Sequence, residues 1–147
     1  LVDEPGFLIG PDAEKAGTIL HGTEAVLATT ESTVPWTTVM IRKSFGVAAA
    51  AHYGPDGYVL AWPSAESGPL PLEGGVAVAF KKEISEAEDP EAKRKELEEK
   101  MAKNQNPFPR AEAFSVHEII DPRETRKYIS LWAERIQTQL KASLMSR

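Results

Sequence analysis

Short apolar runs alternate along the chain with longer stretches in which apolar residues recur at helical spacing. β-Branched and apolar residues fill 34–42 and 57–62, and we predict a buried strand in each. Helical spacing of apolar or small residues predicts helices over about 13–32 and 72–84, and a final helix from Pro122. Strands that alternate with helices in this way are typical of an α/β domain.

Proline and aspartate mark the ends of these elements. Pro11 suits the first turn of the first helix, residues 63–71 and 104–109 are expected to be a loop and a break, and Asp121 is expected to cap the final helix. The final helix has one apolar face, which another part of the structure must cover. This face consists of Tyr128, Leu131, Trp132, Ile136 and Leu140.

Two further features of the pattern concern helix surfaces. Gly17 and Gly22 lie inside the first predicted helix, where each costs about 1 kcal/mol relative to alanine. Tight helix packing, a nearby backbone and a nearby ligand are three explanations for them.

The stretch 81–104 carries mixed charges, with acidic and basic residues at the spacing that supports an exposed helix. A solvated surface explains these charges without a partner.

The composition is that of one ordinary globular domain, which we expect to occupy residues 1–147. Hydrophobic residues make up 41% and charged residues 27%. The formal net charge of -5 argues against nucleic-acid binding, which begins with a basic surface.

The chain has no cysteine, which excludes disulfides, thiolate nucleophiles and cysteine-ligated metals. The apolar stretches, such as 46–51, are far shorter than the roughly 20 residues that span a membrane. We therefore expect a protein of the cytoplasm, or of the mitochondrial matrix in a eukaryote, without a membrane partner.

The sequence does not indicate catalysis by side chains. His21, His52 and His117 lie in unrelated settings and form no metal-ligand pair, so no metal site is expected. The glycine-rich phosphate loop, the dinucleotide fingerprint and the Gly-x-Ser-x-Gly elbow are all missing. What remains is the small-residue turn at 45–51, which can present consecutive N–H groups to an oxyanion at a helix N-terminus. Close helix packing is the alternative explanation for this turn.

Several motifs follow one another along the chain in a fixed order. They are Pro5-Gly6-Phe7-Leu8-Ile9-Gly10, Ala16-Gly17, His21-Gly22, Val34-Pro35, Arg42-Lys43, the turn at Gly46, Ala61-Trp62-Pro63-Ser64-Ala65-Glu66, Glu73-Gly74-Gly75 and Ile119-Ile120-Asp121-Pro122-Arg123-Glu124-Thr125-Arg126. In this order they resemble the carboxyltransferase (beta) subunits of propionyl-CoA carboxylase and related biotin-dependent acyl-CoA carboxylases. The resemblance implies a crotonase-like (ClpP/crotonase) ββα superhelix, of which each subunit has two, and this chain is similar to most of the second. Leu1-Val2 reads as a cut strand, which leaves a natural chain and an incomplete fragment as alternatives.

The resemblance also implies a mechanism in which backbone groups hold the charge. In the family, carboxybiotin carried on a partner subunit or domain gives its carboxyl group to the α-carbon of an acyl-CoA of the acetyl or propionyl class. The N-terminal domain supplies an oxyanion hole for the thioester, and the C-terminal domain of a partner subunit supplies one for the biotin ureido oxygen. By position, the latter corresponds here to the N–H groups of Val47 and Ala48, with Phe45 and Gly46 completing the biotin-binding turn.

The partners implied by the resemblance are the N-terminal carboxyltransferase domain, the biotin carboxylase and biotin carboxyl carrier components, and further copies of the chain. We therefore expect the isolated segment to be inactive. Two other functions stay open. One is a non-catalytic crotonase-like assembly module, whose subunit contact uses the last helix and the face of Gly17 and Gly22. The other is a component of a biotin-dependent acyl-CoA decarboxylase.

The turn departs from the family pattern in its second half. Val47 stands where the second glycine is expected, although valine does not freely adopt a positive φ. Ala49 and Ala50 replace larger or polar residues, and the stretch 68–75 differs from that of propionyl-CoA enzymes. These departures predict a different subfamily or an altered acyl preference.

Overall fold

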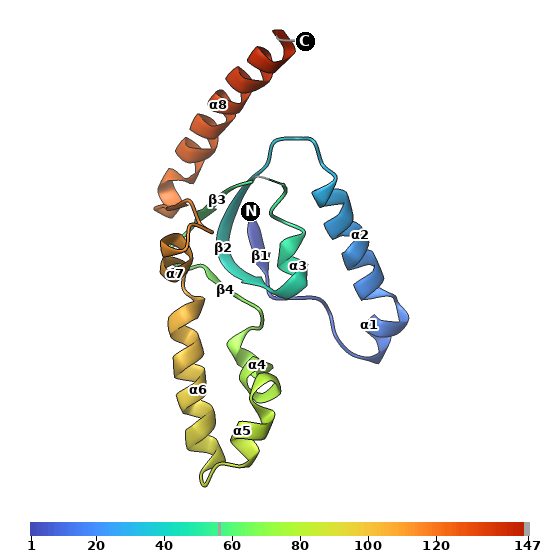
Figure 1. The fold of residues 1–147 in the computed structure, drawn as a ribbon, viewed down its shortest axis with the longest axis vertical. Coiled ribbons are helices and arrows are strands. Elements are labelled where there is room, and N and C mark those ends of the chain that lie inside the picture. The colour runs from blue at the N-terminus through green and yellow to red at the C-terminus, as the bar shows by residue number, and fades with distance from the viewer. Residues whose placement is uncertain (56, 146–147) are drawn as a thin grey trace.

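The computed structural model describes residues 1–55 and 57–145, which form a parallel sheet with helices around it (Figure 1). The strands are β1 (Val2–Glu4), β2 (Thr37–Phe45), β3 (Tyr58–Ala61), β4 (Glu66–Gly68) and β5 (Glu118–Ile119). The helices are α1 (Pro11–Lys15), α2 (Thr18–Thr30), α3 (Gly46–Ala50), α4 (Leu72–Ala79), α5 (Lys81–Ser85), α6 (Pro90–Gln105), α7 (Pro107–Glu112), the 3-10 helix η1 (Pro122–Glu124) and α8 (Thr125–Met145). Among the described residues, no helix is long and apolar enough to cross a membrane.

β2 is the central strand of the sheet. Its first half pairs with β3 as far as Met40 opposite Ala61, whereas its end pairs with β4, where Phe45 lies opposite Gly68. β1 also pairs with β2, β5 pairs with β3, and all of these pairs are parallel. Parallel neighbours need crossover connections, which helices and long loops provide here. The end of β2 therefore lies beside β4 and leads directly into α3.

Both faces of the sheet are buried, as is usual for parallel strands. Alternating side chains of each strand point to opposite faces. On one face, Val39, Leu60 and Ile120 pack against Tyr128 and Ile129 at the beginning of α8. The other face carries a second cluster, against which Tyr53 and Ala111 of α7 pack. This cluster consists of Met40, Val59, Ala61, Ala65 and Val116.

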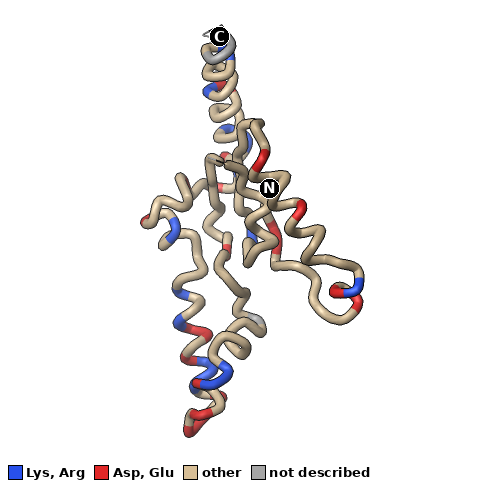
Figure 2. Tube along the Cα trace, turned by 45° about the vertical axis from the view of Figure 1, so that its right-hand side comes forward, with Lys and Arg blue, Asp and Glu red and all other residues tan. Residues whose placement is uncertain are grey.

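Helices α4, α5 and α6 lie between β4 and β5 in the chain and project away from the sheet (Figure 1). Figure 2 shows charges of both signs gathered along α5 and α6. Lys93 of α6 lies 3.1 Å from Glu83 of α5, and Arg94 lies 2.8 Å from Glu98 on the same helix. The Asp89 side chain accepts hydrogen bonds from backbone N–H groups of the first turn and caps α6. The exposed, charged helix predicted over 81–104 is confirmed for its larger part as α6, whereas residues 81–85 form the separate helix α5.

The single helix predicted over 13–32 is wrong, because the chain forms two helices that divide at Gly17. Gly17 has a φ of 74°, a left-handed value that glycine adopts without strain. Gly22 has a different role, since a Cβ atom at this position would lie 2.2 Å from Cζ of Phe7. Tight packing within the chain therefore explains Gly22, and a backbone turn explains Gly17.

The predicted strands are confirmed, with shifted ends. β3 falls within 57–62, while β2 begins at Thr37 and continues to Phe45, later than the predicted span of 34–42. Pro35 explains the late start, since proline has no N–H group to donate to a sheet. The region predicted as a loop after β3 contains β4, whose 3 residues are too few to show an alternating pattern.

Two helical boundaries are also corrected. The helix predicted over 72–84 divides into α4 and α5 at Phe80, whose φ of -117° and ψ of 26° are not helical. The break predicted over 104–109 contains α7, in which Pro107 occupies the first turn, where its missing N–H group would have no helical acceptor. The final helix is confirmed as η1 followed by α8, and the Asp121 side chain accepts a hydrogen bond in the first turn of η1.

Candidate active site

The turn between β2 and α3 brings together the predicted residues from Phe45 to Ala48. Phe45 is 1% exposed and has extended backbone angles, with φ at -122° and ψ at 142°. Gly46 begins α3 with a φ of 64°, a value that residues with a side chain rarely adopt. A Cβ atom at Gly46 would lie 3.4 Å from the carbonyl oxygen of Pro69, which follows β4. Glycine is therefore favoured at this position by its backbone angle, and a Cβ atom there would also touch the neighbouring loop.

Val47 and Ala48 lie in the first turn of α3, where backbone N–H groups have no acceptor within the helix. In the described part of the chain, Phe114 is the only non-glycine residue with a positive φ, so Val47 has an ordinary conformation. The positive φ of the turn belongs to Gly46, and valine at the next position introduces no such strain. The Val47 side chain is 64% exposed, whereas Ala48 is 4% exposed. Two adjacent donors therefore stand at the end of β2, with Ala48 anchored in the core.

The residues that follow α3 are held by hydrogen bonds from α2, from β2 and from Trp36 just before β2. The carbonyl oxygen of His52 accepts hydrogen bonds from Thr38 Oγ1 at 2.6 Å and from Trp36 Nε1 at 2.9 Å. Thr29 Oγ1 of α2 shares its single hydrogen between the carbonyl oxygens of Ala51 at 3.0 Å and Ala25 at 2.9 Å. Because these contacts come from α2, from β2 and from the segment between them, they fix the position of the turn relative to the sheet.

A pocket of about 200 Å³ lies beside the turn. It is lined by small and polar residues of β2, α3, β4 and α7 and of the segment after α3. These residues are Ser44, Gly46, Ala49, Ala50, Tyr53, Ser67, Gly68 and Arg110. Sequence reasoning missed Ser67 and Arg110, because it predicted a loop at β4 and a break at α7. The pairing of β4 with β2 is the feature that would have placed Ser67 near the turn.

The polar atoms of this pocket fall into two groups. The Ser44 and Tyr53 hydroxyl groups are hydrogen-bonded to each other, and the Tyr53 hydroxyl also donates to Met40 Sδ at 2.9 Å. Ser67 Oγ and Arg110 Nε, by contrast, are buried and have no hydrogen-bond partner among the described residues. Buried polar groups normally have partners, so this second pair requires an explanation.

The histidines take structural or surface positions. His117 Nδ1 accepts a hydrogen bond from the Val59 N–H group at 3.0 Å, next to the pairing of β3 with β5. His21 Nδ1 lies 3.2 Å from a carboxylate oxygen of Glu24 on the exposed surface of α2. His52 contributes its backbone carbonyl to the anchoring of α3. Within 1–55 and 57–145, no group of three or more histidine, cysteine, aspartate or glutamate side chains is arranged to hold a metal ion.

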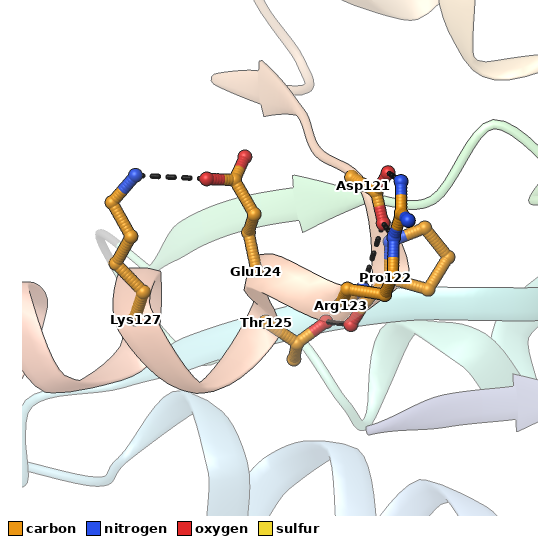
Figure 3. Close-up of polar contacts among 6 residues, drawn as sticks. All are labelled: Asp121, Pro122, Arg123, Glu124, Thr125 and Lys127. Atoms are coloured by element: carbon orange, nitrogen blue, oxygen red, sulfur yellow. Dashed lines mark hydrogen bonds and ion pairs between the residues drawn. The ribbon is translucent and has the colours of Figure 1, made fainter.

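The motif that begins at Asp121 forms the entry to α8 (Figure 3). The Asp121 carboxylate accepts hydrogen bonds from Nη2 of Arg123 at 2.6 Å and from its backbone N–H group at 2.8 Å. These bonds lower the pKa of Asp121 to about 2, and the bond from the Arg123 side chain has the largest effect. Thr125 Oγ1 donates to the Pro122 carbonyl at 2.7 Å and accepts from Trp62 Nε1 at 2.8 Å. The motif therefore stabilises the start of α8 and attaches it to the end of β3.

Known proteins similar to this chain match it along almost its whole length. The family model described as the carboxyl transferase domain matches residues 1–146. The methylmalonyl-CoA carboxyltransferase 12S subunit of Propionibacterium freudenreichii subsp. shermanii is 41% identical over 143 residues, which cover 95% of this chain and 27% of the relative. The methylmalonyl-CoA decarboxylase subunit alpha of Propionigenium modestum is 39% identical over 134 residues, which cover 88% of this chain and 26% of the relative.

Solved structures show the same relationship. A transcarboxylase 12S structure, described as a hexamer assembly with methylmalonyl-coenzyme A and methylmalonic acid bound, matches with a TM-score of 0.83 and 40% sequence identity. The match covers 93% of this chain and 27% of that one. The chain thus spans about a quarter of the length of the curated relatives it matches. The crotonase-like α/β fold expected from the sequence is confirmed.

Proposed function

This chain belongs to the carboxyl transferase domain family, and we propose that it is the C-terminal part of the carboxyltransferase component of a biotin-dependent acyl-CoA carboxylase. Residues 1–147 are then one C-terminal crotonase-like domain, which acts with an N-terminal domain that binds the thioester. The proposed reaction transfers a carboxyl group from carboxybiotin to the α-carbon of an acyl-CoA of the acetyl or propionyl class.

The observation that carries this proposal is the pair of adjacent N–H groups at the start of α3. β2 turns through Gly46 into the helix and leaves the N–H groups of Val47 and Ala48 without helical acceptors. Paired N–H donors stabilise negative charge on an oxygen in a preorganised site. When bound, carboxybiotin supplies the carboxyl group, with developing negative charge on its ureido oxygen. In our proposal, Val47 and Ala48 hold that oxygen, while Phe45 and Gly46 set the direction of the turn.

The surroundings of the turn suit a cofactor that arrives from outside the domain. Gly46 and Val47 are exposed, whereas Ala48 and Ala49 are buried beneath them. A biotin group delivered by a partner therefore has access to the donors, and the buried alanines keep their positions fixed. Because the donors are backbone groups, the change of the family's second glycine to Val47 preserves both of them.

We further propose that the chain acts in an oligomer with an N-terminal carboxyltransferase domain, a biotin carboxylase and a biotin carboxyl carrier. Transcarboxylase 12S is described as a hexamer. In this chain, Ile19, Leu20 and Leu27 of α2 are 59%, 62% and 56% exposed. Exposed apolar side chains gathered on one helix suit burial against another domain or copy.

A decarboxylase component is the second candidate function. The observation in its favour is the decarboxylase subunit of Propionigenium modestum, which is 39% identical and nearly as similar as the carboxyltransferase relative. A decarboxylase that uses biotin needs the same N–H donors, because the same ureido oxygen accepts charge. The turn alone is therefore compatible with both reactions.

The direction of carboxyl transfer separates the two enzymatic functions, and a control without biotin tests the dependence that both share. A complete subunit carrying this chain is mixed with propionyl-CoA and with a carboxylated carrier protein, and a carrier without biotin serves as the control. We expect methylmalonyl-CoA to form only with the biotin-bearing carrier. Release of CO₂ from methylmalonyl-CoA without forward transfer would identify the decarboxylase component. A folded subunit that supports neither reaction would contradict the proposal and favour an assembly module.

A further inference from the structure

We propose that the pocket beside the turn binds the carboxylate of an α-carboxylated acyl thioester through Arg110 and Ser67. This inference rests on the proposed function and identifies the group that the site holds next to the Val47–Ala48 donors. Both residues come from elements other than the turn, Ser67 from β4 and Arg110 from α7.

Ser67 provides one donor in a buried setting. It is the middle residue of β4, is 3% exposed and lies opposite Ser44 of β2 in the sheet. Its Oγ is buried without a hydrogen-bond partner, and the residue lines the pocket. A buried hydroxyl group loses its hydration, and this loss is uncompensated unless another group accepts or donates a hydrogen bond. Because Ser67 Oγ itself has almost no accessible surface, the hydroxyl group must turn toward the pocket, where an acceptor oxygen supplies the missing bond.

Arg110 of α7 provides the second donor to the pocket. Its carbonyl oxygen accepts hydrogen bonds from the N–H groups of Ser115 at 2.9 Å and Val116 at 3.2 Å, and Val116 belongs to the core. The backbone of Arg110 is therefore fixed to the segment that leads into β5. Its Nε is buried without a hydrogen-bond partner. The planar fork of guanidinium donors matches the two oxygens of a carboxylate.

The pocket is small and open to solvent on one side. Its volume of about 200 Å³ gives room for a carboxylate without setting an upper limit on the rest of the ligand. Ala49, Ala50 and Gly68 line the remaining wall and bring no side-chain donor or acceptor. The pocket thus accommodates a carboxylate and the carbon that bears it, and its free polar atoms belong to Ser67 and Arg110.

The positive charge of Arg110 and the unpaired donors of Ser67 and Arg110 determine which kind of ligand fits the pocket. Ser44 and Tyr53 are already hydrogen-bonded to each other, so they do not require a ligand. An apolar acyl chain would leave the Ser67 and Arg110 donors unpaired, and a cation would be repelled by the guanidinium. A carboxylate accepts hydrogen bonds from both Ser67 and Arg110. Because Gly46 belongs to the turn and also lines the pocket, the bound carboxylate lies next to the N–H donors.

Malonyl-CoA and acetyl-CoA provide the test, since they differ only by the carboxylate. Their binding to a complete subunit carrying this chain is measured by calorimetry for the wild type and for Arg110→Met, which keeps an unbranched apolar stem. We expect Arg110→Met to weaken malonyl-CoA binding by about tenfold or more, and acetyl-CoA binding by less than about twofold. Ser67→Ala should weaken malonyl-CoA binding by about three- to tenfold. Arg94→Met, at an exposed arginine paired with Glu98, is the matched control and should change neither.

Three results would overturn the proposal. Equal weakening of both thioesters in Arg110→Met and Ser67→Ala would show a structural role, and unchanged malonyl-CoA binding in both variants would show that the pocket does not hold the carboxylate. Malonate alone is the third arm, because a loss of malonate binding without a loss of malonyl-CoA binding would assign the pocket to free carboxylates. Should Arg110→Met lower the melting temperature and lose all binding, Ser67→Ala decides. Suppose the wild type prefers malonyl-CoA to acetyl-CoA, Arg110→Met loses this preference, and the wild type transfers no carboxyl group. The proposed function would then be wrong, whereas this binding site would stand.

Discussion

Replacing Ala48 with proline in a complete subunit should lower the rate of carboxyl transfer by about 10²- to 10³-fold, the usual effect of removing one oxyanion donor. Proline removes the N–H group of residue 48 and adds no reactive side chain. Since Ala48 lies in the first turn of α3, its N–H group has no helical acceptor, and the helix loses no internal hydrogen bond. The measurement is the steady-state rate of carboxyl transfer from the biotin-bearing carrier to propionyl-CoA.

Val47→Ala is the matched control for that experiment. It keeps both N–H groups and shortens only a side chain that is 64% exposed. We expect its transfer rate to stay within about twofold of the wild type, since exposed substitutions rarely perturb a structure. A proline variant that is folded and as fast as Val47→Ala would show that residue 48 donates no hydrogen bond in the reaction.

Phe45→Ala should lower the free energy of unfolding by about 3–5 kcal/mol, because it removes a large buried ring and leaves a cavity. Phe45 is 1% exposed, and it connects the core to the turn as the residue immediately before α3. Its ring also reaches β4, where Cε1 would lie 3.5 Å from a Cβ atom at Gly68. Urea titration followed by circular dichroism measures this loss.

The chain offers a matched phenylalanine for comparison. Phe108 of α7 is 55% exposed, and Phe108→Ala should change the free energy of unfolding by less than about 0.5 kcal/mol. A Phe45→Ala variant as stable as Phe108→Ala would contradict the assignment of Phe45 to the core. The turn would then be positioned only by the hydrogen bonds to the residues that follow α3.

The turn itself was predictable from local sequence, because a run of mostly small residues begins at Gly46 directly after the strand. Its role was not predictable in this way, since small residues also permit close packing. The hypothesis for Val47 and Ala48 came from the ordered motifs along the chain, which resemble those of one family. The structure adds that the positive φ lies at Gly46, so the valine that departs from the family pattern fits without strain.

The pocket was beyond local prediction, because its walls come from distant parts of the chain. Ser67 reaches it through the pairing of a strand of 3 residues, too short to produce a pattern of its own. Arg110 reaches it through a helix of 6 residues that contains two prolines, which suggest a break when read alone. Tertiary contacts decided both elements. The division of the first helix at Gly17 was missed for a related reason, since apolar spacing continues across a glycine whose φ is left-handed.

The central claim is that the N–H groups of Val47 and Ala48 hold the ureido oxygen of biotin. A crystal structure of a complete subunit carrying this chain, with biotin bound, tests it most directly. The claim predicts that the ureido oxygen lies about 2.7–3.1 Å from both backbone nitrogen atoms. Biotin bound with that oxygen against a side chain, or away from the start of α3, would contradict the claim.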